Sequence, residues 1–358
     1  MSASLTPSNS RAAWKGSEID YRTVGMHVLT ENEIAEIDAA LDHLRSLGDV
    51  DFAAITQAEF PLSVCRPFLE RAADELRDGV GFLLLRGLPR ARYSEDDMAR
   101  IYFGLGTYLG TAVAQSYLGE LLGNVLDVSD IVAHTRGYRS GGGQRMHTDS
   151  ADIVSLMCLR AARSGGGSRI VSALAVHDEL LRRRPDLLQL LYDGYVFRRM
   201  ELDAQYGDGV VVRRVSIFER HGDTVSCYVS GAYPRRAVEA GDAVMSAAQQ
   251  DALDEFERIA SSPEFTLDMS IGEGDIQFLN NRVILHGRTD YEDWPEVARR
   301  RHMLRLWLRA PSWPGLPETY GAHKAADFAG WLRQRQPFQE LPSRYLDEMT
   351  TKRREQAA

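Results

Sequence analysis

The apolar residues of several segments recur every three or four positions, which is the period of an amphipathic helix. Residues 30–47 show this most clearly, because they begin with Thr30 and Glu33 at the spacing of a capping box and keep their apolar side chains on one face. The same pattern recurs in three further stretches: residues 64–77, the residues that follow Ser94, and residues 246–260. We expect these segments to be helices on the outside of the fold.

Other segments have the period of two that is typical of β-strands, or are apolar throughout. Residues 82–87 (FLLLRG) predict a strand buried on both faces, and residues 214–229 predict a hairpin that turns at Gly222 and Asp223. Alternation is strictest near the end, where one face carries two arginines and the other is mostly apolar: Arg301, Met303, Arg305 and Trp307 against His302, Leu304, Leu306 and Leu308. The chain is therefore expected to be mainly β with flanking helices.

The composition adds a size limit to this picture. The chain has 358 residues, of which 44% are apolar and 26% charged, as expected for a globular protein with a sizeable core. No linker-like stretch divides it, and its Ser-rich start lacks the apolar region of a secretory signal. We predict a flexible N-terminal tail over residues 1–20 and one domain with helical insertions over residues 21–358.

Charge and cysteine content exclude several classes of partner and compartment. A net charge of −9 argues against nucleic acid and anionic membranes as partners, because both require a clustered basic surface. No apolar run approaches the roughly 20 residues needed to cross a bilayer. Cys65, Cys158 and Cys227 are too few and too scattered for a disulfide framework, so we expect a cytoplasmic protein.

The first candidate for chemistry is the pair His147 and Asp149, which follows the glycine run at residues 141–143. If this segment is a strand, side chains two positions apart leave the same face and could share one metal ion. Two other pairs have the same spacing in settings that do not favour a metal. His177 and Glu179 begin a predicted helix, where such side chains diverge by about 200°. His221 and Asp223 flank a predicted hairpin turn.

Four motifs in order resemble those of the taurine dioxygenase and clavaminate synthase-like group of Fe(II)/2-oxoglutarate-dependent oxygenases. They are the HTD segment, a GG-x-Ser turn about twenty residues later, the NNRVILH strand and the RRHMLRLWL strand. The resemblance covers roughly residues 81–310. It implies a double-stranded β-helix, or jelly roll, with helices outside it, so that residues 21–358 would form a single jelly-roll oxygenase domain.

The resemblance also implies roles for individual residues. His147, Asp149 and His286 would hold iron, and such a triad leaves coordination positions open for 2-oxoglutarate and O2. Arg301 would pair with the distal carboxylate of 2-oxoglutarate, because a guanidinium binds such a group through two hydrogen bonds. Ser168 stands where the family usually has threonine and retains the hydroxyl.

The expected reaction is oxidation of a small molecule with release of succinate and CO2. In the family that the chain resembles, a small residue at the position of Asp149 opens a site for halide. The resemblance therefore implies oxygen insertion and not halogenation, while desaturation and ring closure stay open. Five residues are candidates to bind a substrate with an acidic group, such as an amino acid or a biosynthetic intermediate: Arg305, Gln115, Tyr117, Arg136 and Tyr138. An exposed sheet edge is the other interpretation of the last four.

Two other functions are compatible with these residues. A zinc hydrolase could use the same His/Asp/His set with a metal-bound water, although it would not need Arg301. A non-catalytic jelly-roll binding protein would bind its ligand without metal. The sequence identifies neither the substrate nor the oligomeric state, so a homo-oligomer stays open.

Overall fold

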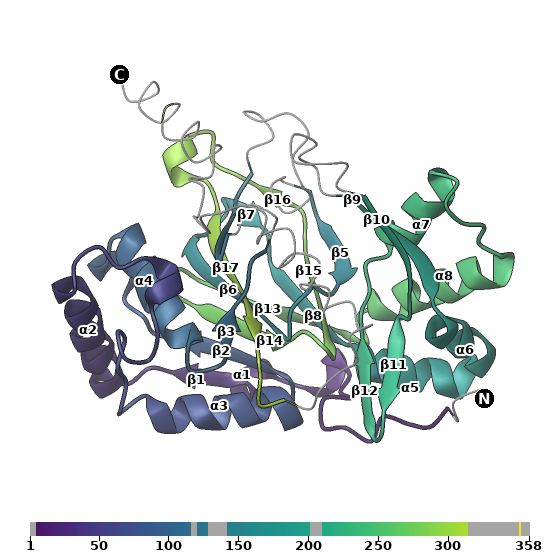
Figure 1. Cartoon of the computed structure of the whole chain (residues 1–358), viewed down its shortest axis with the longest axis horizontal. Helices are drawn as coiled ribbons and strands as arrows, with labels where there is room; N and C mark the ends of the chain where they lie inside the picture. The colour runs from purple at the N-terminus through teal and green to yellow at the C-terminus, as the bar shows by residue number, and fades with distance from the viewer. Residues whose placement is uncertain (1–4, 116–119, 128–141, 201–209, 314–350, 352–358) are drawn as a thin grey trace.

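The computed structural model describes residues 5–115, 120–127, 142–200, 210–313 and 351. Two β-sheets form its centre, and helices lie to either side of them (Figure 1). The larger sheet has the strand order β1-β2-β14-β6-β17-β3, and β4 also pairs with β17. Its strands are β1 Met26–Val28, β2 Phe82–Arg86, β3 Thr111–Ala112, β4 Leu122–Val125, β6 Ile153–Arg160, β14 Ile276–Asn280 and β17 His302–Arg309.

The smaller sheet contains the two histidines of the candidate site. Its strand order is β13-β8-β15-β5, and all of its pairs are antiparallel. These strands are β5 Gln144–His147, β8 Ser168–Ser172, β13 Thr266–Met269 and β15 Ile284–Arg288. Three two-stranded ribbons complete the β structure: β7 Ser164–Gly165 with β16 Tyr291–Glu292, β9 Tyr195–Met200 with β10 Val210–Val215, and β11 Phe218–His221 with β12 Thr224–Cys227.

The helices form two groups. One group packs beside the larger sheet: α2 Glu31–Ser46, α3 Arg66–Asp78 and α4 Glu95–Gly106 (Figure 1). The other lies beside the smaller sheet: α5 Ala173–Arg183, α6 Pro185–Asp193, α7 Ala232–Glu239 and α8 Ala247–Ala260. A short helix, α1 Tyr21–Val24, precedes β1, and single 3-10 turns lie at Gly16–Glu18, Phe52–Ala54, Arg90–Arg92 and Val297–Arg299. In the described ranges no helix is long and apolar enough to cross a bilayer.

Most elements lie where the sequence pattern predicts them. The helices α2, α4 and α8 each begin with a capping box, at Thr30, Ser94 and Ser246. The predicted hairpin turns at Gly222 and is β11–β12, although its first strand begins at Phe218 because residues 210–215 pair with β9 instead. The prediction of a mainly β protein with flanking helices is confirmed.

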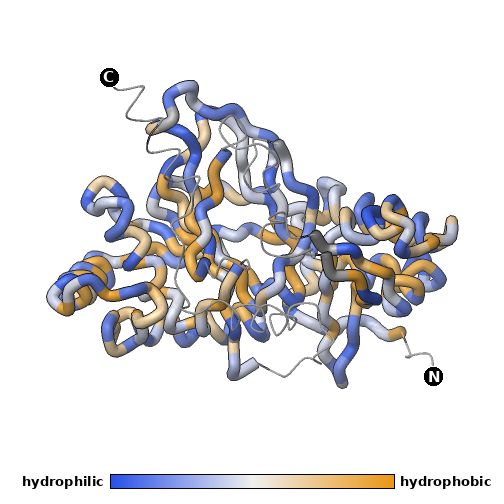
Figure 2. The backbone as a smooth tube through the Cα atoms, turned by 45° about the horizontal axis from the view of Figure 1, so that its top comes forward, coloured by the Kyte–Doolittle hydropathy of each residue, from blue (hydrophilic) through white to orange (hydrophobic). Residues whose placement is uncertain are grey.

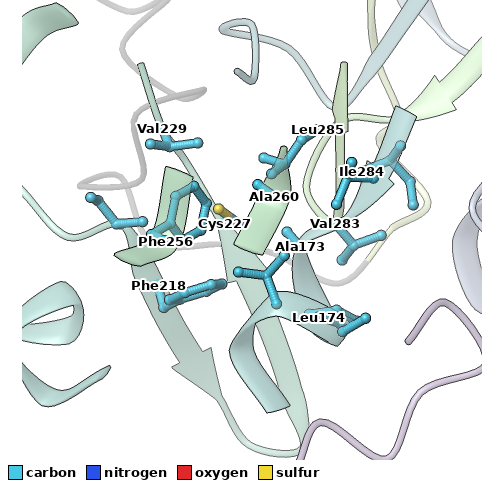
Figure 3. Packing of buried hydrophobic residues seen from close by; sticks show 14 of the residues in the cluster. Ala173, Leu174, Phe218, Cys227, Val229, Phe256, Ala260, Val283, Ile284 and Leu285 are labelled. Atoms are coloured by element: carbon cyan, nitrogen blue, oxygen red, sulfur yellow. The ribbon is translucent and has the colours of Figure 1, made fainter. Parts of the chain in front are cut away.

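Two apolar cores hold these layers together. One lies between the larger sheet and helices α2 to α4, and includes Leu304, Leu306 and Leu308 from the predicted packed face of β17. The other joins the smaller sheet to α5, α6 and α8, and Figure 3 shows part of it: Ala173, Leu174, Phe218, Cys227, Val229, Phe256, Ala260 and residues 283–285. Hydrophobic stretches accordingly gather along the central strands in Figure 2, whereas outer turns are hydrophilic.

The start of the chain differs from the predicted flexible tail. Trp14 is only 7% exposed, packs edge-on against Phe82 and donates its indole N–H to the carbonyl of Val80 at 2.8 Å. The backbone N–H and hydroxyl of Ser8 both donate to the carboxylate of Asp178, at 2.9 and 2.8 Å. Residues 8–14 are therefore part of the packed fold, fixed by contacts with residues far along the chain.

Glu36 of α2 caps the segment that leads into α3. Its carboxylate accepts backbone N–H groups from Ser63, Val64 and Cys65 at 2.5–2.7 Å. Burial would raise the pKa of Glu36, but these N–H donors outweigh it and lower the pKa from about 4.5 to about 2. The charged carboxylate therefore stabilises the fold above pH 4.5, and this contribution disappears as the pH falls towards 2.

Replacing Glu36 with glutamine is expected to lower the free energy of unfolding by about 1–2 kcal/mol at pH 7, because a charged acceptor is lost. Urea unfolding at pH 7 and at pH 3 would measure the effect. The difference between the two proteins should shrink at pH 3, where the wild type begins to lose the same charge. A difference that does not change with pH would contradict this assignment.

Candidate metal centre and active site

Three side chains that can bind a metal converge between the sheets. His147 ends β5 and is the direct strand partner of His286 in β15, and their ring centroids are 4.3 Å apart. The carboxylate oxygens of Asp149 lie 3.9 Å from His147 Nε2 and 3.6 Å from His286 Nε2. One ligand atom from each residue falls within 4.8 Å of the other two. The three predicted ligands therefore form one cluster.

The prediction that Asp149 lies in the same strand as His147 was wrong, although the two side chains do lie close together. Strand β5 ends at His147, and Asp149 lies in the loop beyond it. Asn281, in the turn between β14 and β15, holds this loop. Its side chain accepts the N–H of Asp149 at 2.9 Å and donates to the carbonyls of Asp149 and Ala151, both at 2.7 Å. The turn that leads to His286 thus also positions Asp149.

Two side chains of β17 hold one oxygen of the Asp149 carboxylate from the opposite sheet. The indole N–H of Trp307 donates to Oδ2 at 2.8 Å, and Nη1 of Arg305 lies 3.5 Å from the same atom. Burial would raise the pKa of Asp149, but Arg305 and the two histidines hold this pKa well below the usual range of a carboxyl. Asp149 is therefore an anion near neutral pH, as a metal ligand must be.

The histidine His147 has the protonation state that a metal ligand needs. Its Nδ1 lies 2.9 Å from the carbonyl oxygen of Arg145, which can only accept a hydrogen bond, so we assign the proton to Nδ1 and a lone pair to Nε2. Burial and the neighbouring His286 lower the pKa of His147 to about 4. The ring is therefore neutral near pH 7, with Nε2 facing Asp149. This donor set fits Fe(II).

A cavity of about 160 Å³ adjoins the cluster, and it is lined by His147, His286, Ser168, Arg301 and Arg305 among others. Arg301 is 6% exposed, and its Nη1 has no hydrogen-bond partner in the part of the chain that the structure describes. Burial lowers the pKa of Arg301. A buried guanidinium with an unsatisfied N–H suits a carboxylate, so the cavity fits the distal end of 2-oxoglutarate.

Ser168 begins β8 on the wall of the same cavity. Its hydroxyl donates to Oε1 of Gln277 at 3.1 Å, and the amide of Gln277 points its nitrogen at the sulfur of Met269. The hydroxyl oxygen of Ser168 can still accept a hydrogen bond, but its proton is donated to Gln277. A ligand carboxylate at Arg301 would therefore gain a hydrogen bond from Ser168 only if this hydroxyl rotated.

The predicted substrate residues are only partly described. Arg305 lines the cavity, but its Nε donates to Gln115 Oε1 at 2.7 Å, and its Nη1 faces Asp149. The amide nitrogen of Gln115 donates to the carbonyls of Arg305 and Leu121, at 2.7 and 3.1 Å. The oxygen and the nitrogen of this buried amide therefore both bond to groups of the protein. Gln115 supports Arg305 and does not line the cavity. The other three candidates, Tyr117, Arg136 and Tyr138, lie outside the described residues.

Three residues beside the site were not selected from the sequence. Trp307 could have been found, because strand alternation places it on the same face as Arg301 and Arg305. Arg288 could have been found in the same way, because it follows His286 by two positions in one strand and so lies on the same face. Asn281 belongs to the NNR motif, but its bonds to Asp149 join residues that are 132 positions apart and leave no local pattern.

The two histidine pairs that were set aside because of their helix and turn settings lie away from the metal cluster. His177 is fully buried in α5, where its ring nitrogens meet Asp178 at 2.7 Å and Tyr192 at 2.9 Å. His221 lies at the end of β11, next to the hairpin turn. Among the described residues, His147, Asp149 and His286 are the one group that could hold a metal ion.

Comparison with protein families decides the identity. Residues 43–307 match the model of the taurine catabolism dioxygenase TauD, TfdA family. The chain belongs to this family. Its members are Fe(II)- and 2-oxoglutarate-dependent oxygenases, and the chain is accordingly an enzyme of this kind, with Fe(II), 2-oxoglutarate and O2 as its cofactor and cosubstrates.

Two relatives match most of the chain. FR-33289 synthase of Streptomyces rubellomurinus is 29% identical over 331 residues, which cover 89% of this chain and 95% of the relative. The taurine hydroxylase-like protein SAT17 of Stachybotrys chartarum is 28% identical over 308 residues, which cover 83% and 78% of the two chains.

Solved structures confirm the jelly-roll fold of this TauD-family oxygenase. Asparagine oxygenase in complex with Fe(II), 3-hydroxyasparagine and succinate has a TM-score of 0.62 at 16% identity, with 79% of this chain and 93% of that chain covered. The non-haem iron oxygenase OrfP with Fe and α-ketoglutaric acid has a TM-score of 0.58 at 13% identity, with 80% and 94% covered.

Replacing Trp307 with phenylalanine is expected to weaken Fe(II) binding by about 10- to 100-fold, because the carboxylate of Asp149 loses the N–H that orients it. Competition with a coloured chelator under anaerobic conditions would measure the Fe(II) affinity. Trp14→Phe is the matched control, since it removes an indole hydrogen bond to Val80 without touching the site. Equal affinities in the wild type and Trp307→Phe would show that this contact does not orient Asp149.

Proposed function

We propose that this oxygenase hydroxylates a small molecule that carries an acidic group, such as an amino acid, and that His147, Asp149 and His286 hold its Fe(II). In this proposal Arg301 and Ser168 bind 2-oxoglutarate. The observation that carries it is the convergence of three metal-binding side chains within 4.8 Å beside a cavity that also contains a buried arginine. A metal site alone would need neither Arg301 nor the cavity.

Each residue has a defined task in this proposal. Bound Fe(II) and 2-oxoglutarate would supply the activation of O2 and the oxidation of a C–H bond, with release of succinate and CO2. His147 and His286 provide two nitrogen donors, and the anionic Asp149 provides one oxygen donor. Trp307 and Arg305 both hold Oδ2 of Asp149, which leaves Oδ1 for the metal. Arg301 would bind the distal carboxylate of 2-oxoglutarate.

The substrate class rests on charge and on the relatives. Arg305 adds a second guanidinium to the wall of the cavity, which favours an acidic group on the ligand. The structures with similar folds contain hydroxylated amino acids, namely 3-hydroxyasparagine in asparagine oxygenase and (3S)-hydroxy-L-Arg in OrfP. Hydroxylation is therefore favoured over desaturation and ring closure, which use the same centre with a different placement of substrate.

An anaerobic titration with Fe(II) and 2-oxoglutarate tests the site. We expect a visible metal-to-ligand charge-transfer band in the wild type, no band in His286→Ala and a weakened band in Arg301→Met. Screening amino acids and other small acids for O2-dependent succinate release then tests the substrate class. Activity with Zn(II) in the absence of O2, together with no charge-transfer band in folded, metal-loaded protein, would instead support the hydrolase interpretation.

A further inference from the structure

A third buried arginine, Arg288, lines the same cavity as Arg301 and Arg305. Arg288 is the last residue of β15 and lies two positions after His286, so both side chains leave the same face of the strand. Its strand partners are Gln144 on β5 and Ser168 on β8. Arg288 is 7% exposed, and it lines the cavity together with both partners.

Arg288 and Arg301 line the same cavity and lie near the same aromatic ring. The guanidinium carbons of Arg288 and Arg301 lie 4.7 and 5.3 Å from the centre of the same ring, that of Tyr291. On the other side, the glycine turn before Ser168 abuts Arg301, because a Cβ added to Gly166 would lie 3.2 Å from Arg301 Nε. Directly paired residues of adjacent strands have Cβ atoms about 5 Å apart, which puts Ser168 next to Arg288.

Both positive and negative side chains surround this space. Arg288 and Arg301 both carry a guanidinium group, which is charged at neutral pH. Carboxylates also lie nearby: Asp127 and Asp290 interact electrostatically with Arg288, and Asp293 with Arg301. Asp290 also accepts the N–H of Gly143, and Asp293 accepts that of Arg301. Guanidinium groups that line one cavity suit an anionic ligand, because each can donate charge-assisted hydrogen bonds to a carboxylate.

We propose that Arg288 is a second guanidinium of the 2-oxoglutarate site, and that it and Arg301 hold the distal carboxylate of the cosubstrate from two sides. The proposal rests on the proposed role of Arg301. Its geometric basis is the common cavity, the shared ring of Tyr291 and the strand pairing of Arg288 with Ser168. Arg288 also donates from Nη2 to the carbonyl of Gly142 at 2.5 Å, a bond that fixes the direction of its side chain.

Comparison of two keto acids tests whether Arg288 contacts the distal carboxylate. 2-Oxovalerate retains the keto acid end of 2-oxoglutarate and has a methyl group in place of the distal carboxylate. We expect Arg288→Met to raise the Kd of 2-oxoglutarate by roughly 10- to 100-fold, as for loss of a charge-assisted hydrogen bond. The Kd of 2-oxovalerate should change by less than about threefold, since the lost partner is absent from this ligand. Both values come from the charge-transfer band measured without O2.

Two further variants serve as positive and negative controls. Arg301→Met should show the same selective loss for 2-oxoglutarate, and Arg169→Met should show none, because Arg169 pairs with Asp268 on the exposed face of the same sheet. Equal losses for both keto acids in Arg288→Met would mean that Arg288 only supports β5 through Gly142, and an unchanged Kd for 2-oxoglutarate would also overturn the proposal. A wild type that binds Fe(II) without any band would refute the proposed function instead.

Discussion

Replacing Asp149 with alanine is expected to abolish succinate formation from 2-oxoglutarate. The variant removes the one anionic donor of the cluster and leaves Arg305 and the indole N–H of Trp307 without the oxygen they share. Fe(II) affinity should fall by more than the roughly 100-fold seen when a supporting residue is removed, because the ligand itself is lost. Anaerobic chelator competition and succinate analysis measure the two effects.

Asp149→Asn separates charge from shape. The amide oxygen can still accept the hydrogen bond from Trp307, while the negative charge that partners Arg305 and the metal is gone. We expect the fold to persist and Fe(II) binding to be nearly as weak as in Asp149→Ala. Full turnover in either variant would show that Asp149 is not a ligand.

Prediction from sequence worked best where strand alternation decides which side chains face the core and which face the cavity. The face of β17 with Leu304, Leu306 and Leu308 packs on the core as expected. The opposite face brings Arg305 to the cavity, and Arg301, which directly precedes the strand, lines the same cavity. Strand alternation assigns each residue to one of two faces. Because the apolar face packs on the core, the arginines on the other face point away from it. The same rule would have identified Trp307.

The sequence was less informative where position depends on distant contacts. The two-residue spacing of His147 and Asp149 suggested a shared strand face, but the strand ends between them and Asn281 and Trp307 fix Asp149 from 132 and 158 positions away. The Ser-rich start suggested a flexible tail for a similar reason. Local composition does not reveal that Trp14 fits against Phe82.

The segment that carries Asp149 is joined to the turn before His286 by a buried ion pair. Arg282 donates to Asp152 Oδ1 from Nε at 3.0 Å and lies 2.9 Å from it through Nη2, and the two side chains are 7% and 3% exposed. The other oxygen of Asp152 accepts the N–H of Ala310, just beyond β17, at 3.0 Å. One carboxylate thus links the loop after β5, the β14–β15 turn and the end of β17.

Asp152→Ala is expected to lower the free energy of unfolding by about 3–5 kcal/mol, because it leaves the charge of Arg282 buried without its partner. Urea unfolding measures the loss, and the double variant Asp152→Ala/Arg282→Met should recover part of it, since the unpaired charge is then absent. Fe(II) affinity should also fall in the single variant, because Asp149 and His286 lie on the two segments that this pair joins. A single variant as stable as the wild type would show that the ion pair does not fix the site, and Asn281 would then be the main tie between these segments.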